Sequence, residues 1–452
     1  MLRAGVLACL LALAPNAEAQ LGVSFNRTGS GARAAGMANA FIAISDDGTA
    51  ASWNPSGLAQ LRKPELSVVS TTAGDSATIS GFRARDDRAS YTTAQSTYRS
   101  SYLDFASLAV PLTLWGKPVT FQGSWRRLYS IDYRELFTTE RVPLVPDGPP
   151  PATLDFNGDT LGAVDLVSVA LAVNVTRRLS LGAGVNLWRG DWQEGIVGSE
   201  TVTDPPGAPR FATIDRTNRV RGESFNLGLM LAYPRWSVGL VYQGPLRSDF
   251  SGTVETASSD TAETVHESAE GSLQFPRAFG VGAAFRPAAL WTVALDVTWD
   301  DWTDAIFDTP FTGRVNFLDG LPPSLSSTRD TLSVNAGAER LFTGEGFVVP
   351  LRFGAAWEPQ GARDPYTRDP VNFVMLAIGT GYNTNSLKLD AAFQYGWTSF
   401  TTGGSFEPGG GSTRLPTAVG ERSNSQWRLK LSLILRVTDT DKLKRVARKV
   451  FG

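Results

Sequence analysis

The sequence predicts an all-β fold, namely a 14-stranded antiparallel transmembrane β-barrel plugged by a small N-terminal helical hatch. Three observations predict it: an export signal at the N-terminus, segments that alternate between apolar and polar residues, and connections that are alternately tight and long. Composition agrees, because 45 Gly, 12 Trp and 19% charged residues among 452 are unusual for a soluble α/β enzyme. A mean hydropathy of −0.10, without a long apolar run beyond the first twenty residues, argues against membrane-spanning helices.

Charge and cysteine content exclude further classes of protein. Lys and Arg total 42 against 44 Asp and Glu, a formal charge of −2, so there is no basic surface for nucleic acid. The one cysteine, Cys9, lies in the export signal, so the mature chain has neither disulfides nor thiol metal ligands. The one histidine, His266, lies in a polar segment and is expected to be solvated. We therefore expect no enzyme activity, no cofactor and no metal.

The N-terminus predicts the compartment. Arg3 precedes an apolar run from Ala4 to Ala14, and Ala17-Glu18-Ala19 forms a small-x-small cleavage site. Residues 1–19 are therefore interpreted as a signal peptide. For an exported barrel this predicts the outer membrane of a Gram-negative-type cell. The expected partners are outer-membrane lipid, lipopolysaccharide and the outer-membrane insertion machinery.

Alternation with a period of two is clearest in three segments, 291–300, 387–397 and 427–437. In the second, Leu389 and Phe393 share an apolar face while Lys388 and Asp390 share a polar one, as in strands with one face toward lipid. Aromatic residues at or near strand ends favour lipid-facing girdles over a soluble sandwich. These residues are Trp188, Trp236, Trp291, Trp299, Trp397 and Trp427.

The connections predict the strand count. The predicted strands are 64–80, 101–113, 117–134, 161–175, 178–189, 222–233, 235–248, 274–286, 290–302, 332–342, 347–358, 372–382, 386–398 and 427–437. Tight links follow every second strand, whereas the other links are mostly long and polar, for example 191–221, 251–271 and 304–330. Short turns on one side, long loops on the other and an even count are typical of an outer-membrane barrel, spanning 64–437 here.

A barrel of this size must be narrowed or plugged, because eight strands leave a bore that side chains fill whereas 16 to 18 leave an aqueous channel. Residues 20–63 provide a hatch. Small residues dominate from Gly31 to Ile44 and predict short helices, and a second turn over 49–53 is expected to stop at Asn54-Pro55. A disordered tail is the alternative, but it would expose Phe41, Ile44 and Trp53.

The hatch also carries a resemblance to a known family. Its Gly31-Ala-Arg-Ala-Ala-Gly-Met37 block, Asp46-Asp47 and Trp53-Asn-Pro-Ser-Gly-Leu58 resemble the N-terminal signature of the FadL/TodX family of outer-membrane transporters for hydrophobic compounds. Ser56 stands where the family has Ala. Later segments, such as 236–250 and 332–359, resemble family strands in the same order. Gly31, Arg33, Gly36, Asn54, Pro55 and Ser56 are the hatch motif.

The resemblance implies a function. Hydrophobic compounds, such as long-chain fatty acids or aromatic hydrocarbons, would be captured at the outer surface, held against the hatch and released passively through a lateral opening in the wall. Gly123-Ser124 on the third strand breaks its apolar row and is the predicted kink for that opening.

Candidate ligand contacts lie on the hatch and in the lumen. Phe41, Ile44 and Trp53 would offer apolar surface, although each could equally be plug packing. Inward parity places three cations in the lumen, where a cation could hold a carboxylate, although pairing with Asp390 is the favoured explanation. These cations are Lys388, Arg428 and Lys430.

Some features leave alternatives open. The long links lack a strongly apolar helical stripe that could capture a ligand, which leaves the substrate open. The Gly-Ala-Arg-x-x-Gly-Met form of the hatch also resembles family members that act as shuttles for secreted substrates, so a secretion or assembly partner is the main alternative. A general porin is disfavoured by the hatch. Residues 438–452 form a basic tail with apolar residues at helical spacing, interpreted as either a periplasmic lipid contact or a solvated end.

Overall fold

The computed structural model describes residues 28–84, 86–114, 116–259, 261–310, 312–364, 367–404 and 418–437. The predicted signal peptide and the predicted basic tail lie outside these residues. Within them, no helix is long and apolar enough to cross a membrane.

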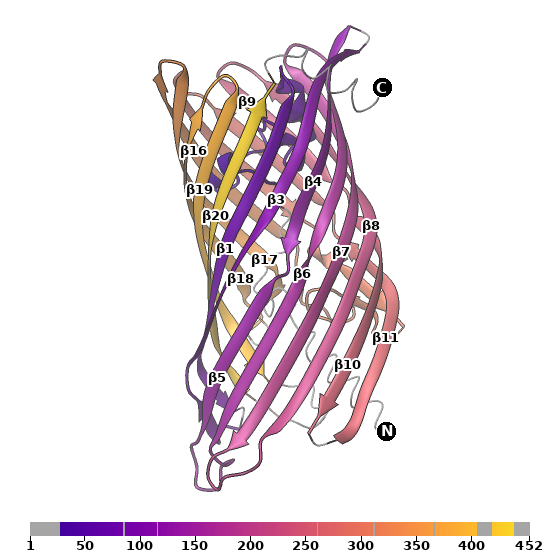
Figure 1. Ribbon diagram of the computed structural model, residues 1–452, viewed down its shortest axis with the longest axis vertical. Coiled ribbons are helices and arrows are strands. Elements are labelled where there is room, and N and C mark those ends of the chain that lie inside the picture. Colours follow the sequence, from indigo (N-terminus) through magenta and orange to yellow (C-terminus); the bar gives the residue numbers. More distant parts are fainter. Residues whose placement is uncertain are drawn as a thin grey trace.

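A closed antiparallel ring of fourteen strands forms the wall, as predicted (Figure 1). The ring strands are, in order, β1 Glu65–Ala84, β3 Ala94–Leu114, β4 Lys117–Ser130 with its continuation β5 Tyr133–Pro143, β6 Ala152–Asn174, β7 Leu179–Val202, β8 Arg210–Ala232, β9 Trp236–Gln243 with β10 Leu246–Ser258, β11 Thr261–Phe275 with β12 Ala278–Phe285, β13 Trp291–Asp300 with β14 Ile306–Thr309, β16 Thr331–Gly344, β17 Phe347–Arg363, β18 Pro370–Asn383, β19 Leu387–Gly404 and β20 Ala418–Arg436. The short strands β2 Ala89–Tyr91 and β15 Gly313–Asn316 pair with β5 and β14. Pairing of β1 with β20 closes the ring, so backbone groups in lipid have partners.

Helical turns lie mainly in the hatch, inside the upper part of the ring in Figure 1. They are α3 Ala32–Gly36, η1 Ala50–Ser52 and η2 Pro55–Gln60, and a further turn, η3 Trp302–Asp304, follows β13. Asn54 does not end a helix. Its side chain accepts a hydrogen bond from the Ser56 amide and caps the start of η2, where the fixed φ of Pro55 suits the first helical position.

The alternation sorts side chains between lipid and lumen as predicted. On β19, Leu389 and Phe393 are 44% and 43% exposed, whereas Asp390 and Gln394 are 5% and 2% exposed. Trp188 is an exception to the predicted girdles. It is only 3% exposed and points into the lumen, where its indole N–H donates to Ser224 Oγ at 2.8 Å. Its position on β7 has inward parity, and proximity to a predicted strand end did not reveal that parity.

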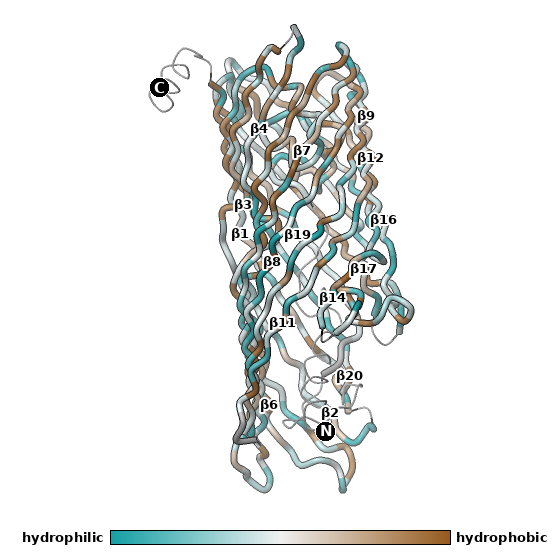
Figure 2. The backbone as a smooth tube through the Cα atoms, turned by 90° about the vertical axis from the view of Figure 1, so that its right-hand side faces the viewer, coloured by the Kyte–Doolittle hydropathy of each residue, from teal (hydrophilic) through white to brown (hydrophobic). Residues whose placement is uncertain are grey.

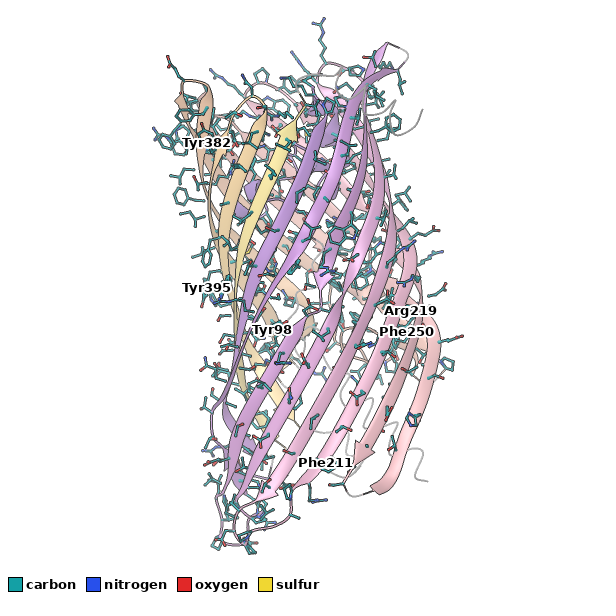
Figure 3. The ribbon with its side chains drawn as sticks, viewed as in Figure 1. Tyr98, Phe211, Arg219, Phe250, Tyr382 and Tyr395 are labelled. Atoms are coloured by element: carbon teal, nitrogen blue, oxygen red, sulfur yellow. The ribbon has the colours of Figure 1, made fainter. Side chains whose placement is uncertain are left out.

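Two of the predicted long loops are strands. Pairing of β7 with β8 runs from Leu179 to Glu200, and β10 pairs with β11 through the predicted loop at 251–271. Outward residues on β7 change from apolar to charged after Leu187, and Asp191 pairs there with Arg219 on β8 at 2.9 Å (Figure 3). Hydrophobic residues accordingly gather toward the end with the tight turns (Figure 2). The polar extensions stand beyond the apolar band, on the side that is extracellular in outer-membrane barrels.

Glycines on the wall let the hatch backbone approach closely. A Cβ at Gly182 on β7 would lie 2.3 Å from the Pro55 carbonyl carbon and the Ser56 amide nitrogen. Gly228 on β8 faces Asn54 and Pro55 in the same way, and Gly354 on β17 faces the backbone of Met37. The hatch therefore fits a lumen whose lining is trimmed for it.

We expect Gly182→Ala to weaken hatch docking, because overpacking of a tight contact costs about 1–3 kcal/mol. Gly198→Ala, on the same strand, is the matched control, since a Cβ there meets nothing within 4 Å. Thermal unfolding of the purified barrel should show a lower midpoint for the first variant alone. Equal midpoints for the two variants would contradict the docking role.

Candidate functional site

Polar side chains of the wall hold the hatch backbone from several sides. Asp296 on β13 accepts the Phe41 and Ile42 amides at 2.6 and 2.7 Å. Asn54 donates to the Leu229 carbonyl at 3.2 Å, and Gln394 on β19 donates to the Ala35 carbonyl at 3.1 Å. Because the hatch has few regular hydrogen bonds of its own, the wall satisfies backbone groups that would otherwise be buried without partners.

A buried network of charges fixes the start of the hatch. Arg33 on α3 donates from Nε and a terminal nitrogen to both Glu339 oxygens at 3.2 Å, and it also pairs with Asp46. Glu339 in turn accepts from Arg352 at 2.7 Å, and Arg352 reaches Asp390 at 2.7 Å. The Arg352 side chain is 1% exposed. Removing one member of such a network leaves an uncompensated charge, so the network specifies one hatch position.

The hatch residues predicted to face a ligand are packed in this structure. Phe41 and Ile44 are 0% and 2% exposed and lie in an apolar cluster with Ala284 and Ala294 of the wall. Trp53 stacks edge-on against Phe41 at 6.0 Å and donates to the Ser30 carbonyl at 2.8 Å. Trp53 alone of the three lines an interior cavity, of about 50 Å³.

The wall is interrupted at its third strand, but not at the predicted position. Pairing continues through Gly123 and Ser124 on both sides, toward β3 and toward β6, so the predicted kink there is wrong. Gly123 faces outward with nothing within 4 Å, and its lack of a side chain is not used to bend the strand. The β3–β4 ladder instead ends at Phe105 and Arg126, and the strand breaks at 131–132, between β4 and β5.

Beyond this point no ladder joins β3 to β5 within the described residues. We call the stretch between residues 102–104 of β3 and residues 127–133 of β4–β5 the wall break. Two contacts bridge it: the Arg127 guanidinium lies 5.9 Å from the Tyr102 ring, and the rings of Tyr98 and Tyr133 are 6.1 Å apart. The wall break is thus closed by side chains and not by backbone hydrogen bonds.

An interior cavity of about 90 Å³ reaches the wall break. Residues of both lips line it, including Tyr102, Asp104, Arg127 and Tyr133, together with hatch residues 28–30. Two of the three predicted cations, Arg428 and Lys430, line it as well, because inward parity on β20 directs both to the lumen. The lips were missed by sequence reasoning, although an aspartate between Leu103 and Phe105 in an apolar row signals an unusual environment.

The predicted pairing of these cations with Asp390 is wrong, because Arg352 occupies that carboxylate. Lys430 pairs with Asp104, which also accepts hydrogen bonds from Thr71 and Ser30. Lys388 lies elsewhere, within electrostatic reach of Asp47 and Glu65 near the tight-turn end. Among the described residues, Arg428 has neither an ion pair nor a hydrogen bond, so its charge is available to a ligand.

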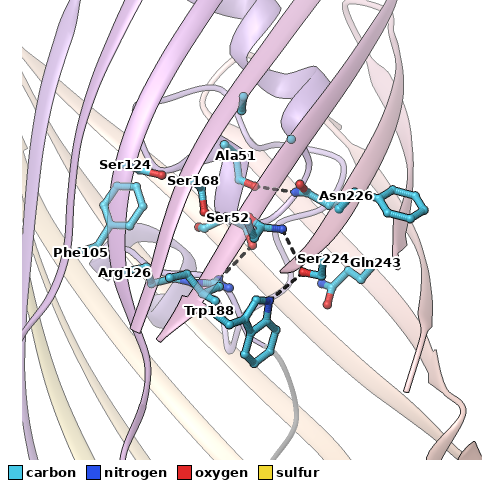
Figure 4. A pocket seen from close by; sticks show the side chains of 15 residues that line it. Ala51, Ser52, Phe105, Ser124, Arg126, Ser168, Trp188, Ser224, Asn226 and Gln243 are labelled. Carbon is cyan, nitrogen blue, oxygen red and sulfur yellow. Dashed lines mark hydrogen bonds between the residues drawn. The ribbon is translucent and has the colours of Figure 1, made fainter. Parts of the chain in front are cut away.

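A further cavity, of about 40 Å³, lies between η1 and the wall (Figure 4). Arg126 donates to the Ser52 carbonyl and Asn226 to the Ala51 carbonyl across it, and Trp188 forms part of its lining. An engineered apolar cavity that binds benzene measures about 150 Å³. Each of these three interior cavities is smaller, so an aromatic ligand enters them only after side chains move. The described residues hold no cluster of three or more His, Cys, Asp or Glu that could bind a metal.

The sequence matches one protein family over more than half of its length. A family model described as outer membrane protein transport protein (OMPP1/FadL/TodX) matches residues 157–404. The chain belongs to this family. The match begins within β6, so the hatch motif lies outside it. Family membership and the closed ring together identify an outer-membrane β-barrel, and the expected class of hydrophobic-compound transporters is confirmed. No curated protein matches the sequence.

Solved structures share the fold at low sequence identity. A Pseudomonas aeruginosa FadL homologue is 14% identical, with a TM-score of 0.64 over 92% of this chain and 100% of that chain. The Ralstonia pickettii toluene transporter TbuX is 14% identical, with a TM-score of 0.58 over 91% and 99%. The P. putida toluene transporter TodX is 14% identical, with a TM-score of 0.58 over 92% and 100%.

We expect the hatch to loosen in acid, through Asp47. Burial alone would raise the pKa of Asp47, but Lys388, Arg33 and hydrogen bonds from Thr49 outweigh burial and hold the pKa below its ordinary value of 3.8. A depressed pKa stabilises the folded state above pH 3.8, and this stabilisation is lost as pH falls through the folded-state pKa. Asp47→Asn should lower the unfolding midpoint at pH 7 and flatten its dependence on acid. An unchanged acid profile would contradict this role.

Proposed function

We propose that this barrel takes up hydrophobic compounds passively and releases them through the wall break into the membrane. The observation that carries the proposal is the cavity against the hatch, which extends to both lips of the wall break. A compound held there is separated from the lipid by side-chain contacts alone, because β3 and β5 share no ladder. Transport along a gradient needs only those contacts to open.

The same cavity favours an amphiphile with an acidic head. Arg428 and Lys430 approach from β20, and Phe373 and Met375 on β18 supply apolar surface. Lys430 is committed to Asp104, whereas Arg428 is available. A carboxylate on Arg428 would gain charge-assisted hydrogen bonds, and the tail would lie toward the apolar residues. Long-chain fatty acids fit this arrangement, and aromatic hydrocarbons would use the apolar surface alone.

The competing functions lack such support. A porin requires an open lumen, whereas the hatch is docked by hydrogen bonds and buried ion pairs. A secretion or assembly partner would not require a cavity that ends at a break in the wall. The deciding experiment is uptake of radiolabelled fatty acid and toluene by cells that lack their own transporter. Uptake of neither compound, with the barrel correctly inserted, would contradict the proposal.

Arg428→Gln should separate the two classes of substrate. A hydrogen bond to a charged group contributes about 1.5–3 kcal/mol, so we expect fatty-acid uptake at low concentration to fall about tenfold or more. Toluene has no acidic group, and its uptake should not change. Equal losses for both compounds would indicate a packing role for Arg428.

Tyr102→Ala should open the wall break, because it removes the ring over which Arg127 lies. We expect faster uptake of either transported compound, measured as an initial rate in the same cells. Tyr395→Ala is the control, since Tyr395 is 44% exposed on the outer wall (Figure 3). Slower or unchanged uptake by Tyr102→Ala, with normal amounts of inserted barrel, would remove the wall break from the route.

A further inference from the structure

The segment between β13 and β16, residues 301–330, is a folded unit inside the extracellular half of the barrel. Its strand β14 pairs with β11 over three residues and with β15 in a hairpin (Figure 2). Asn316 donates to the Trp302 carbonyl at 3.0 Å, and Asp319 accepts the Ser326 hydroxyl and the Ser327 amide at 2.9 and 2.8 Å. The segment was predicted as a loop, because its order depends on contacts with distant strands. We call it the inner flap.

The inner flap inserts two apolar side chains into the lumen. Trp302 and Leu318 are 1% and 0% exposed, and they pack with inward residues of β6, β7 and β8. Phe275 lies at the centre of this cluster, with ring centroids of Trp302 at 6.1 Å and Trp188 at 5.8 Å. Tyr129 is also 5.9 Å away. Rings at these separations and tilts attract one another beyond simple burial.

The cluster lies between the two cavities described above. Trp188 lines the cavity of about 40 Å³, and Tyr129 lines the cavity of about 90 Å³ that reaches the wall break. Both rings contact Phe275. A compound coming from the extracellular side to the wall break therefore meets this aromatic cluster, where Trp302 and Leu318 fill the space.

Two glycines allow the inner flap to dock. A Cβ at Gly361 on β17 would lie 2.6 Å from both Trp302 Cγ and Leu318 Cδ1. A Cβ at Gly271 on β11 would lie 2.2 Å from the Asp308 carbonyl oxygen on β14. The wall is thus shaped for the inner flap as it is for the hatch. Attachment is nevertheless modest, because β14 pairs with β11 at only 272–274 and the Trp302 N–H donates one bond, to Thr331 at 3.1 Å.

We propose that the inner flap occupies a binding site for an aromatic hydrocarbon, and that the ligand binds beside Phe275 by displacing Trp302 and Leu318. The proposal rests on the uptake function proposed above and specifies a gate and a ligand class for it. A flat aromatic compound replaces an indole ring against Phe275, Trp188 and Tyr129 with similar contacts. The displaced indole regains a partner for its N–H in water, so its release leaves no buried donor without a partner.

Accessibility of Leu318→Cys tests the displacement. Cys9 is the one natural cysteine and lies in the predicted signal peptide, so a membrane-impermeant maleimide applied to intact cells should report position 318. We expect slow labelling that toluene accelerates. Gly361→Ala in the same background should accelerate labelling about tenfold without toluene, because the added methyl overpacks the docked state. Gly198→Ala should have no effect. Labelling that responds neither to toluene nor to Gly361→Ala would overturn the proposal.

A reversible cross-link tests the gate. Ser272 and Asp308 are register partners on β11 and β14, so a Ser272→Cys/Asp308→Cys pair would tie the inner flap to the wall. We expect toluene uptake to fall at least about tenfold in the oxidised pair and to return with reductant, with Ser272→Cys alone as control. Equal uptake by the oxidised and reduced pair would overturn the gate while leaving the uptake function intact. Absence of uptake in the unmodified protein would contradict the uptake function, and toluene-dependent labelling of Leu318→Cys would still decide whether the binding site exists.

Discussion

The structure depends on one constraint: a backbone surrounded by lipid finds no hydrogen-bond partner there, so the sheet must close on itself. Closure with fourteen strands satisfies every ladder but encloses a lumen that the strands' own side chains do not fill. The hatch and the inner flap fill it from the two ends, and both depend on glycines where their backbone or rings meet the wall. A pairing requirement at the lipid face thereby sets the composition of the interior, which explains the 45 glycines.

The hatch is held by polarity more than by apolar burial. Its small residues bring little apolar area, and the wall compensates with amide and carboxylate side chains directed at hatch backbone groups, such as Asp296 at Phe41. The chain of charges from Arg33 through Glu339 and Arg352 to Asp390 adds specificity, because each carboxylate has one geometrically suitable cation. A plug fixed in this way stays in place while ligands pass beside it, and passage then occurs at the wall.

Sequence patterns predicted the ring, the facing of strands such as β19 and the presence of a plug, because lipid imposes a strict period of two on apolar residues. They failed where that period has no force. The extensions of β7 and β8 are polar on both faces, so they were taken for loops, although Asp191 and Arg219 stand opposite one another in register. Gly123 suggested a kink because glycine can bend a strand, but the break at 131–132 depends on which strands find partners. The partner of Asp390 was likewise decided by Arg352, a residue on a strand two positions away in the ring.

The two closures differ in kind, and the difference bears on selectivity. At the wall break, Arg127 over Tyr102 and the Tyr98–Tyr133 pair place polar groups in an apolar surrounding, so opening costs electrostatic and aromatic contacts near lipid. At the inner flap, Trp302 and Leu318 are replaced by a ligand of the same apolar character, so opening is nearly balanced by binding. A polar solute compensates neither loss. A barrel with both closures in series therefore excludes ions and sugars without a narrow pore, and it admits compounds that take the place of its own side chains.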